Sequence, residues 1–392
     1  MPPGQGAQRT SSQGELLRLR ASMFPEDRYS ILGLEVSLRT DSSAVRSFFA
    51  EAYRWFPPRS PAAALQLTAI FRDGSEGSAS ASAGDAWIDL SKSRSPENRA
   101  FLFLFEAMMD GISGSIVLHG AAVSREGRGS ILAGPAFAGK STLAIELMKI
   151  GHQFLSDDAA PLERSTGNLL PFPRAVGIRK GSYPPLLPKR GVHELPHKWL
   201  VDPVQLGARL PVPSCRPTSL FYLDSDESPP VRDDNAATFE IALADSVETV
   251  RKELSPLDPE SVRLLDEGPF PRLAVRFKRG SRPLAALAEL WRRHRDSILF
   301  VEELRKPGPR RTAEPRIEAV ETSRLLLPLV RDILNRGEAG SLMRSHSGRL
   351  TSLVCETAGL LKSVRCYRVV SGTPESTASA IDRIIREESS SS

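Results

Sequence analysis

One short motif limits the folds open to this chain more than any other part of its sequence. Residues Gly134–Ser141 read GPAFAGKS and match the P-loop (Walker A) pattern G-x-x-x-x-G-K-[ST]. Apolar residues over 130–133 predict a strand before the motif, and the spacing of Leu143 and Leu147 predicts a helix over 140–150. The sequence therefore predicts a strand, a loop and a helix of an α/β fold.

Each residue type in this motif suits a phosphate group. Glycines let backbone N–H groups approach phosphate oxygens, and the start of a helix adds the positive end of its dipole. Lys140 is predicted to reach the β- and γ-phosphates of a nucleotide, and the Ser141 hydroxyl to bind Mg²⁺. The alternative is an ordinary glycine-rich turn. The predicted nucleotide-binding residues are Gly134, Pro135, Ala136, Phe137, Ala138, Gly139, Lys140, Ser141 and Thr142.

Two adjacent acidic residues, Asp157 and Asp158 (the acid pair), follow the next apolar stretch at 153–156. In a β-α-β unit the two strands are parallel and the crossover is right-handed. We therefore expect the motif and the acid pair at the carboxyl ends of neighbouring strands, where ligands bind in open α/β sheets. Carboxylates there can hold Mg²⁺, with Ser141 and Asp158 as predicted ligands, and accept a proton from an attacking hydroxyl. The alternative is that one aspartate caps a loop.

Two further residues are weaker candidates. His119 precedes Gly120 between apolar stretches at 116–118 and 121–123, each predicted as a short strand. A histidine in such a place is more often packed or hydrogen-bonded than catalytic. Arg174, in a Phe-Pro-Arg run, is a candidate substrate or phosphate contact, with a solvated surface arginine as the alternative.

The chain divides by composition into three parts. Residues 1–14 are rich in Gly, Ser, Gln and Pro and are predicted to be disordered. An N-terminal α+β domain is predicted over 15–110 and a catalytic domain over 112–390. Prolines and basic residues recur over 177–217, which predicts a long irregular loop that helps to close the site.

Two local predictions concern the N-terminal domain. The apolar stretch Ile31–Leu38 is typical of a strand. The low-complexity run at 74–84, GSEGSASASAG, is typical of a mobile hairpin loop.

Charge and cysteine content restrict the partners and the compartment. The net charge is +5, from 52 basic and 47 acidic residues. This small excess suits an anionic ligand and does not indicate nucleic acid, for which a basic stripe with aromatics is expected. The 3 cysteines lie far apart, and no apolar run is long enough to span a bilayer. A cytoplasmic protein without a membrane partner is expected.

Three segments together resemble the HPr kinase/phosphorylase family: LHGAAV at 118–123, GPAFAGKSTL at 134–143 and GHQFLSDDAAPL at 151–162. The resemblance implies a P-loop kinase domain related to HPr kinase and to phosphoenolpyruvate carboxykinase. It also implies ATP with Mg²⁺ and a serine hydroxyl as acceptor. The family's Glu-x-Arg-Gly-x-Gly signature is not visible, and Pro171–Ile178 occupies its place.

The resemblance also implies catalytic roles by position. Asp157 matches the carboxylate taken as general base, and Asp158 matches its neighbour, which assists or binds Mg²⁺. His119 matches a histidine near that base. Lys140, Ser141 and Thr142 match the nucleotide loop.

The predicted function is a kinase that phosphorylates serine or threonine of a protein or peptide. A P-loop ATPase or nucleotide-dependent switch without a phosphorylated product is the alternative, and a binding scaffold without chemistry is a third reading. The resemblance suggests a homo-oligomer. The sequence leaves open the acceptor, the oligomeric state, the use of phosphorolysis or pyrophosphate, and the role of the N-terminal domain.

Overall fold

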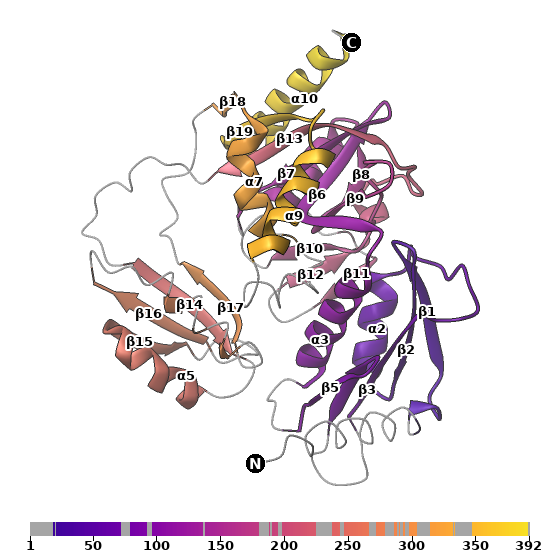
Figure 1. Cartoon of the computed structure of the whole chain (residues 1–392), viewed down its shortest axis with the longest axis vertical. Coiled ribbons are helices and arrows are strands. Elements are labelled where there is room, and N and C mark those ends of the chain that lie inside the picture. The colour runs from indigo at the N-terminus through magenta and orange to yellow at the C-terminus, as the bar shows by residue number, and fades with distance from the viewer. Residues whose placement is uncertain are drawn as a thin grey trace. The chain divides into compact units, whose positions relative to one another are not determined.

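A computed structural model describes most of the folded chain (Figure 1). The described residues are 19, 21–71, 79–91, 96–135, 138–179, 188, 190–194, 198–224, 237–243, 247–265, 272–278, 286–287, 290, 293–294, 298–303, 314–331, 333 and 347–390. Two compact units are present. One comprises Met1–Met23, Thr68–Phe103 and Glu227–Arg310, and the other comprises Phe24–Leu67, Leu104–Asp226 and Arg311–Ser392. The predicted disordered segment 1–14 lies outside the described residues.

A seven-stranded mixed sheet forms the centre of the second unit. Its strand order is β18-β19-β13-β7-β6-β8, and β9 also pairs with β6. Strand β13 is parallel to β19 and β7, whereas β6 is antiparallel to β7, β8 and β9. The strands are β18 (Arg316–Val320), β19 (Arg365–Val370), β13 (Arg216–Asp224), β7 (Arg128–Ala133), β6 (Ser115–Arg125), β8 (Gln153–Ser156) and β9 (Ala159–Glu163).

Helices cover both faces of this sheet, so the unit is a mixed α/β structure. On one face α4 (Lys140–Lys149) and α10 (Pro374–Ser390) pack on Ala121, Val123 and Leu132. On the other face α7 (Thr322–Arg331) and α9 (Ser347–Leu360) pack on Leu118 and Ala122, as Figure 1 shows for their position beside the sheet. The alternation of these residues along β6 follows from the two-residue repeat of a strand.

Strand β6 corrects one prediction. The stretches at 116–118 and 121–123 belong to one continuous strand, and His119 and Gly120 do not interrupt it. Its register against β7 and β9 supplies hydrogen bonds through this point, so the glycine is accommodated within the ladder.

Helix α4 has defined ends that the sequence predicts. Gly139 precedes it in the left-handed region, at φ 92°. At the other end the Gly151 amide donates to the Met148 carbonyl and the His152 amide to the Leu147 carbonyl, a Schellman motif with Gly151 at φ 101°. The Gly134–Ser141 motif is thus followed by a helix of 10 residues that stops at the expected glycine.

The predicted long loop at 177–217 is partly wrong. It contains β10 (Val176–Arg179), β11 (Val192–Glu194) and β12 (Lys198–Val201), which form an antiparallel sheet of order β10-β12-β11, and a short 3₁₀ helix at Pro203–Leu206. Buried Val176, Ile178 and Val201 pack with Ile145 and Met148 of α4. The apolar residues of this segment thus form strands that pack against α4. Residues 180–187, 189 and 195–197 lie outside the described part.

Five strands of the N-terminal part form a sheet in sequence order: β1 (Glu26–Ile31), β2 (Leu34–Thr40), β3 (Leu65–Ile70), β4 (Ser80–Ala83) and β5 (Ala86–Asp89). The predicted strand 31–38 is partly wrong: β2 covers 34–38, but a turn at Leu32 and Gly33, with φ 49° and 84°, separates it from β1, which ends at Ile31. The predicted loop 74–84 is wrong at β4, and 74–78 lie outside the described residues. Helices α2 (Ser43–Ala52) and α3 (Pro96–Gly111) complete this part.

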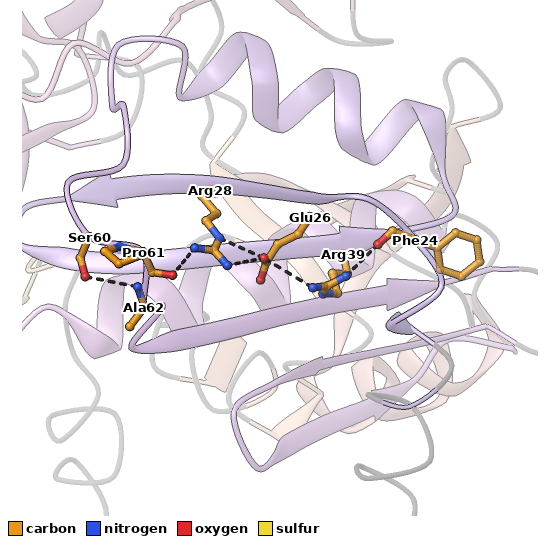
Figure 2. A network of polar contacts seen from close by, with 7 residues as sticks. All are labelled: Phe24, Glu26, Arg28, Arg39, Ser60, Pro61 and Ala62. Atoms are coloured by element: carbon orange, nitrogen blue, oxygen red, sulfur yellow. Dashed lines mark hydrogen bonds and ion pairs between the residues drawn. The ribbon is translucent and has the colours of Figure 1, made fainter.

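Polar contacts fasten the start of β1 (Figure 2). Glu26 accepts a hydrogen bond from Arg28 and forms an ion pair with Arg39. Arg39 also donates to the Phe24 carbonyl at 2.8 Å, and Arg28 donates to the Pro61 carbonyl. These contacts join the first hairpin to the segment that leads to β3.

The first unit contains a second sheet, of order β15-β16-β14-β17 and antiparallel throughout. Its chain order is β14 (Ala237–Leu243), α5 (Val247–Leu254), β15 (Pro259–Leu265), β16 (Arg272–Phe277), the helical residues Leu287 and Leu290, and β17 (Ile298–Glu303). This order is the split β-α-β arrangement of ferredoxin-like folds. It is inserted in sequence between β13 and β18. No helix in the described part of the chain is long and apolar enough to cross a membrane.

Candidate functional site

The Gly134–Ser141 loop connects β7 to α4 and is shaped by two glycines. Gly134 has φ 146°, and a Cβ atom there would lie 2.5 Å from the Leu223 carbonyl oxygen of β13. Gly139 has φ 92° at the start of α4. Only glycine suits both the backbone angle and the close approach at 134. The loop therefore leaves β7 against the neighbouring strand and turns directly into the helix.

Lys140 folds back over this loop. Its Nζ atom donates to the Gly134 and Pro135 carbonyl oxygens, at 2.9 Å each, and the side chain is buried. A lysine held by loop carbonyls is already positioned beside the backbone N–H groups of a helix start, where a phosphate would bind. Ser141 and Thr142 lie in the first turn of α4. Ala136 and Phe137 lie outside the described residues.

Strand β6 lies between the two strands that carry the loop and the acid pair. Ala133, the last residue of β7, is opposite Gly120, and Ser156, the last residue of β8, is opposite Ala122. Strands β7 and β8 run in the same direction because both are antiparallel to β6. The predicted common edge is correct, but the strands are not neighbours. Two strand spacings separate them, about 10 Å.

The acid pair follows the end of β8, as predicted, and β9 begins directly after it. Ser156 is opposite Ala122 and Ala159 is opposite His119, so the register against β6 is unchanged across the pair. The Gly120 amide donates to the Asp158 carbonyl at 3.3 Å within this interval. The pair is therefore a short interruption between β8 and β9, held along its length by β6.

The same register brings His119 and Asp157 to one face. Asp157 falls opposite Ala121, whose side chain packs with Leu143 of α4. His119 is two residues from Ala121 and so lies on that face too, as a diagonal neighbour of Asp157 with Cβ atoms about 7 Å apart. The start of α4, His119 and Asp157 thus share one face of the sheet.

Asp157 is a buried acid in a polar cradle. Its Oδ2 atom accepts a hydrogen bond from the Gly177 amide at 2.9 Å, and Oδ1 has no hydrogen-bond partner in the described part of the chain. Burial and the charge of Asp158 raise the pKa of Asp157 to about 7, although Ser141, Gly177 and Arg174 act in the opposite direction. The Ser141 hydroxyl thus lies close enough to influence the carboxylate without completing a bond to Oδ1. A buried carboxyl with this pKa can hold or release a proton near neutral pH.

Asp158 is paired with Arg174. Its Oδ2 atom lies 2.5 Å from Arg174 Nη2, and the guanidinium carbon lies 5.1 Å from the centre of the Phe105 ring. The Arg174 side chain is 13% exposed, which excludes the solvated surface arginine considered from the sequence. Arg174 is therefore part of the site, but as the partner of the acid pair.

Sequence reasoning missed a third group, the consecutive residues Tyr53–Phe56 that follow α2. Burial raises the pKa of Tyr53 to about 12, with Asp158 adding to the rise and Arg174 opposing it. The Phe56 ring lies 5.0 Å from the Phe172 ring. Arg54 and Trp55 both donate to Asp202, at 2.8 and 3.2 Å. No local motif marks this segment. The one sequence signal that could have indicated burial is its high content of aromatic residues.

The residues present fit a magnesium nucleotide. Mg²⁺ in nucleotide sites takes one or two carboxylates together with substrate phosphates and water. Ser141 and the acid pair offer such a donor set next to a loop shaped for phosphate, and the buried Oδ1 of Asp157 is an acceptor in need of a partner. The described residues contain no group of 3 or more His, Cys, Asp or Glu placed to hold a metal by themselves.

Comparison with known proteins supports the predicted resemblance over part of the chain. An HPr kinase/phosphorylase of Clostridium botulinum (strain Eklund 17B / Type B) is 34% identical over 84 residues, which cover 21% of this chain and 27% of that protein. The protein of the same name from strain Alaska E43 / Type E3 has the same values. The chain thus matches about a quarter of the length of these curated relatives, at 27%. No protein-family model matches.

A solved structure, the Hpr(Ser) kinase/phosphatase from Coxiella burnetii, aligns with 46% of this chain and 95% of its own. Its sequence identity is 19% and its TM-score is 0.22, a score too low to support a conclusion about this chain. The chain therefore has a distant, partial similarity to HPr kinase/phosphorylase, confirmed in sequence.

Proposed function

We propose that this protein transfers the γ-phosphoryl group of ATP to a serine or threonine hydroxyl of a protein or peptide. One observation carries the proposal: the Gly134–Ser141 loop and Asp157 flank the same short stretch of β6, at Gly120–Ala122. A phosphate-binding loop and a buried acid on either side of one strand form two of the parts that phosphoryl transfer requires. The partial similarity to HPr kinase/phosphorylase supports a related fold and ATP as donor.

The proposal gives each group a role. Lys140 and the backbone N–H groups at the start of α4 bind the phosphates of ATP. Mg²⁺, if held by Ser141 and Asp158, would supply charge neutralisation at the transferring phosphoryl group. The acceptor oxygen bonds to the γ-phosphorus as the bond to the bridging oxygen of ADP breaks. Asp157 takes the proton from the acceptor hydroxyl, a task suited to an acid whose pKa is about 7. His119 lies beside this base.

The test is transfer from γ-labelled ATP to proteins and peptides encoded near this chain's gene. Asp157→Asn should lower the rate of transfer by about 10²- to 10⁴-fold, the usual contribution of a positioned base. Nucleotide affinity should change little, because the loop and Lys140 are intact. Asp258→Asn, at a side chain that is 86% exposed, is the matched control and should transfer normally.

Two results would count against the proposal. Steady release of phosphate without a labelled product would support a P-loop ATPase or switch. Full transfer activity in Asp157→Asn would remove the carboxylate from the chemistry.

A further inference from the structure

A segment more than 100 positions earlier in the chain, within the same compact unit, is connected to the acid pair through intermediate residues. Two chains of contacts, called routes below, make this connection, and each leads to one of the two aspartates. Both routes begin in the four consecutive residues Tyr53–Phe56.

The first route leads to Asp158 through Arg174. The Arg174 guanidinium is bonded to Asp158 at 2.5 Å and lies over the Phe105 ring. Tyr53 is fully buried, and its ring lies 5.8 Å from the Phe56 ring, which packs against Phe172 beside Arg174. The Tyr53 hydroxyl has no hydrogen-bond partner in the described part of the chain, but it lies near enough to Arg174 for the two groups to influence each other's pKa. An aromatic face on one side and a carboxylate partner leave an arginine few orientations, since both stacking and charged hydrogen bonds are directional.

The backbone beside Arg174 is held as well. The Arg174 amide donates to the Phe172 carbonyl at 2.7 Å, and the Phe172 amide donates to the Leu155 carbonyl of β8 at 2.8 Å. The Phe172 ring packs against Phe56 at 5.0 Å. Arg174 therefore reaches Asp158 from a backbone tied to the same strand that precedes the acid pair.

The second route leads to Asp157 through the small sheet. Asp157 accepts from the Gly177 amide in β10, and Gly177 pairs with Leu200 of β12. Strand β12 is followed by Asp202, the buried acceptor of Arg54 and Trp55. The donor that orients Asp157 thus belongs to a strand pair fastened at one end by the Tyr53–Phe56 segment.

We infer that Arg174 and Tyr53 are positioning residues for the acid pair, and that the Tyr53–Phe56 segment is an integral part of the site rather than of a separate N-terminal module. This inference rests on the proposed function. It reassigns Arg174 from a substrate contact to a group that acts through Asp158. Positioning matters because displacement of a reacting group by about 1 Å can cost about 10²-fold in rate.

The experiment separates kcat from KM in three variants of the full chain. Arg174→Met should lower kcat about 100-fold, with KM for MgATP and for the acceptor changed less than about threefold. Arg174→Lys, which keeps the charge without the planar fork, should recover about tenfold of that loss. Tyr53→Phe, which keeps the ring, should lower kcat about fivefold.

The control is Arg164→Met. Arg164 forms an ion pair with Glu356, and their side chains are 38% and 33% exposed. This variant loses an arginine–carboxylate pair outside the site and should keep wild-type kcat. A rise in KM for the acceptor with kcat unchanged in Arg174→Met would overturn the inference and restore the substrate-contact reading. Equal kcat in Tyr53→Phe and wild type would overturn the role of Tyr53.

A double-mutant cycle on thermal unfolding needs no activity. If Tyr53 acts through Arg174, the Tm shift of Tyr53→Phe with Arg174→Met should be smaller than the sum of the single shifts. Additive shifts would overturn the link. Absence of transfer by the wild type would overturn the proposed function alone, because the cycle would still decide whether these residues are coupled.

Discussion

The Gly134–Ser141 loop and the acid pair lie on opposite sides of β6. They differ in how far along the sequence the residues lie that hold them in place. Lys140 bonds to carbonyls of Gly134 and Pro135, only 6 and 5 positions away. Asp157 and Asp158 are held by Gly177 and Arg174, 20 and 16 positions away, and indirectly by the Tyr53–Phe56 segment. The loop is a local structure, whereas the acid pair depends on several separate elements. Substitutions should therefore act differently in the two regions.

The largest expected effect concerns Asp157 and its pKa of about 7, raised from 3.8. Because the pKa is raised in the folded state, the contribution of Asp157 to the free energy of unfolding is fully present below about pH 4 and is lost as pH rises through about 7. The loss corresponds to at most about 4 kcal/mol for such a shift. Asp157→Asn should abolish it, so the variant should melt at higher temperature than wild type at pH 8 and at a similar temperature at pH 4. If the difference in melting temperature between the two proteins were the same at pH 4 and pH 8, the raised pKa of Asp157 would be contradicted.

The second effect tests the local region. Gly134→Ala places a Cβ atom 2.5 Å from the Leu223 carbonyl at φ 146°. Strain and overpacking together should cost about 3 kcal/mol. Urea unfolding measures this directly, and Gly127→Ala, where an added Cβ meets nothing within 4 Å but φ is also positive at 77°, separates strain from the clash. Equal losses in the two variants would show that contact with Leu223 is unimportant.

The third prediction separates binding from folding. Lys140→Met should weaken ATP binding about 100-fold, since hydrogen bonds from a charged donor to phosphate contribute about 2–3 kcal/mol. The acid pair should keep its place, because the variant retains its hydrogen bonds to Gly177 and Arg174. Isothermal titration with ATP measures the affinity. An unchanged dissociation constant would exclude the loop as the phosphate site.

The smallest effect tests the remote support of the acid pair. Asp202→Ala removes the acceptor of Arg54, Trp55 and the Val204 amide. The unpaired donors should cost about 2 kcal/mol, discounted because Arg54 is 42% exposed. Transfer activity should fall while ATP affinity does not. Loss of ATP affinity instead would show that the two regions are not independent.

The sequence alone determined the local half of this site. A pattern of glycine, lysine and serine between a strand and a helix appears as predicted, with α4 at Lys140–Lys149 and its stop at Gly151. The acid pair and the segments that resemble HPr kinase/phosphorylase are likewise visible in the sequence. Such features depend on backbone angles and hydrogen bonds within a few residues, and residue type specifies these directly.

The tertiary structure decided how these pieces meet. The placement of β6 between β7 and β8, the strands within 177–217, and the enclosure of Arg174 by Tyr53 and Phe105 all join residues distant in sequence. Pairing of strands and burial of side chains depend on which surfaces remain available after the rest of the chain has packed, and no short motif encodes that choice. For the same reason, the sequence presented Arg174 as a surface or substrate residue, and the fold made it the partner of Asp158.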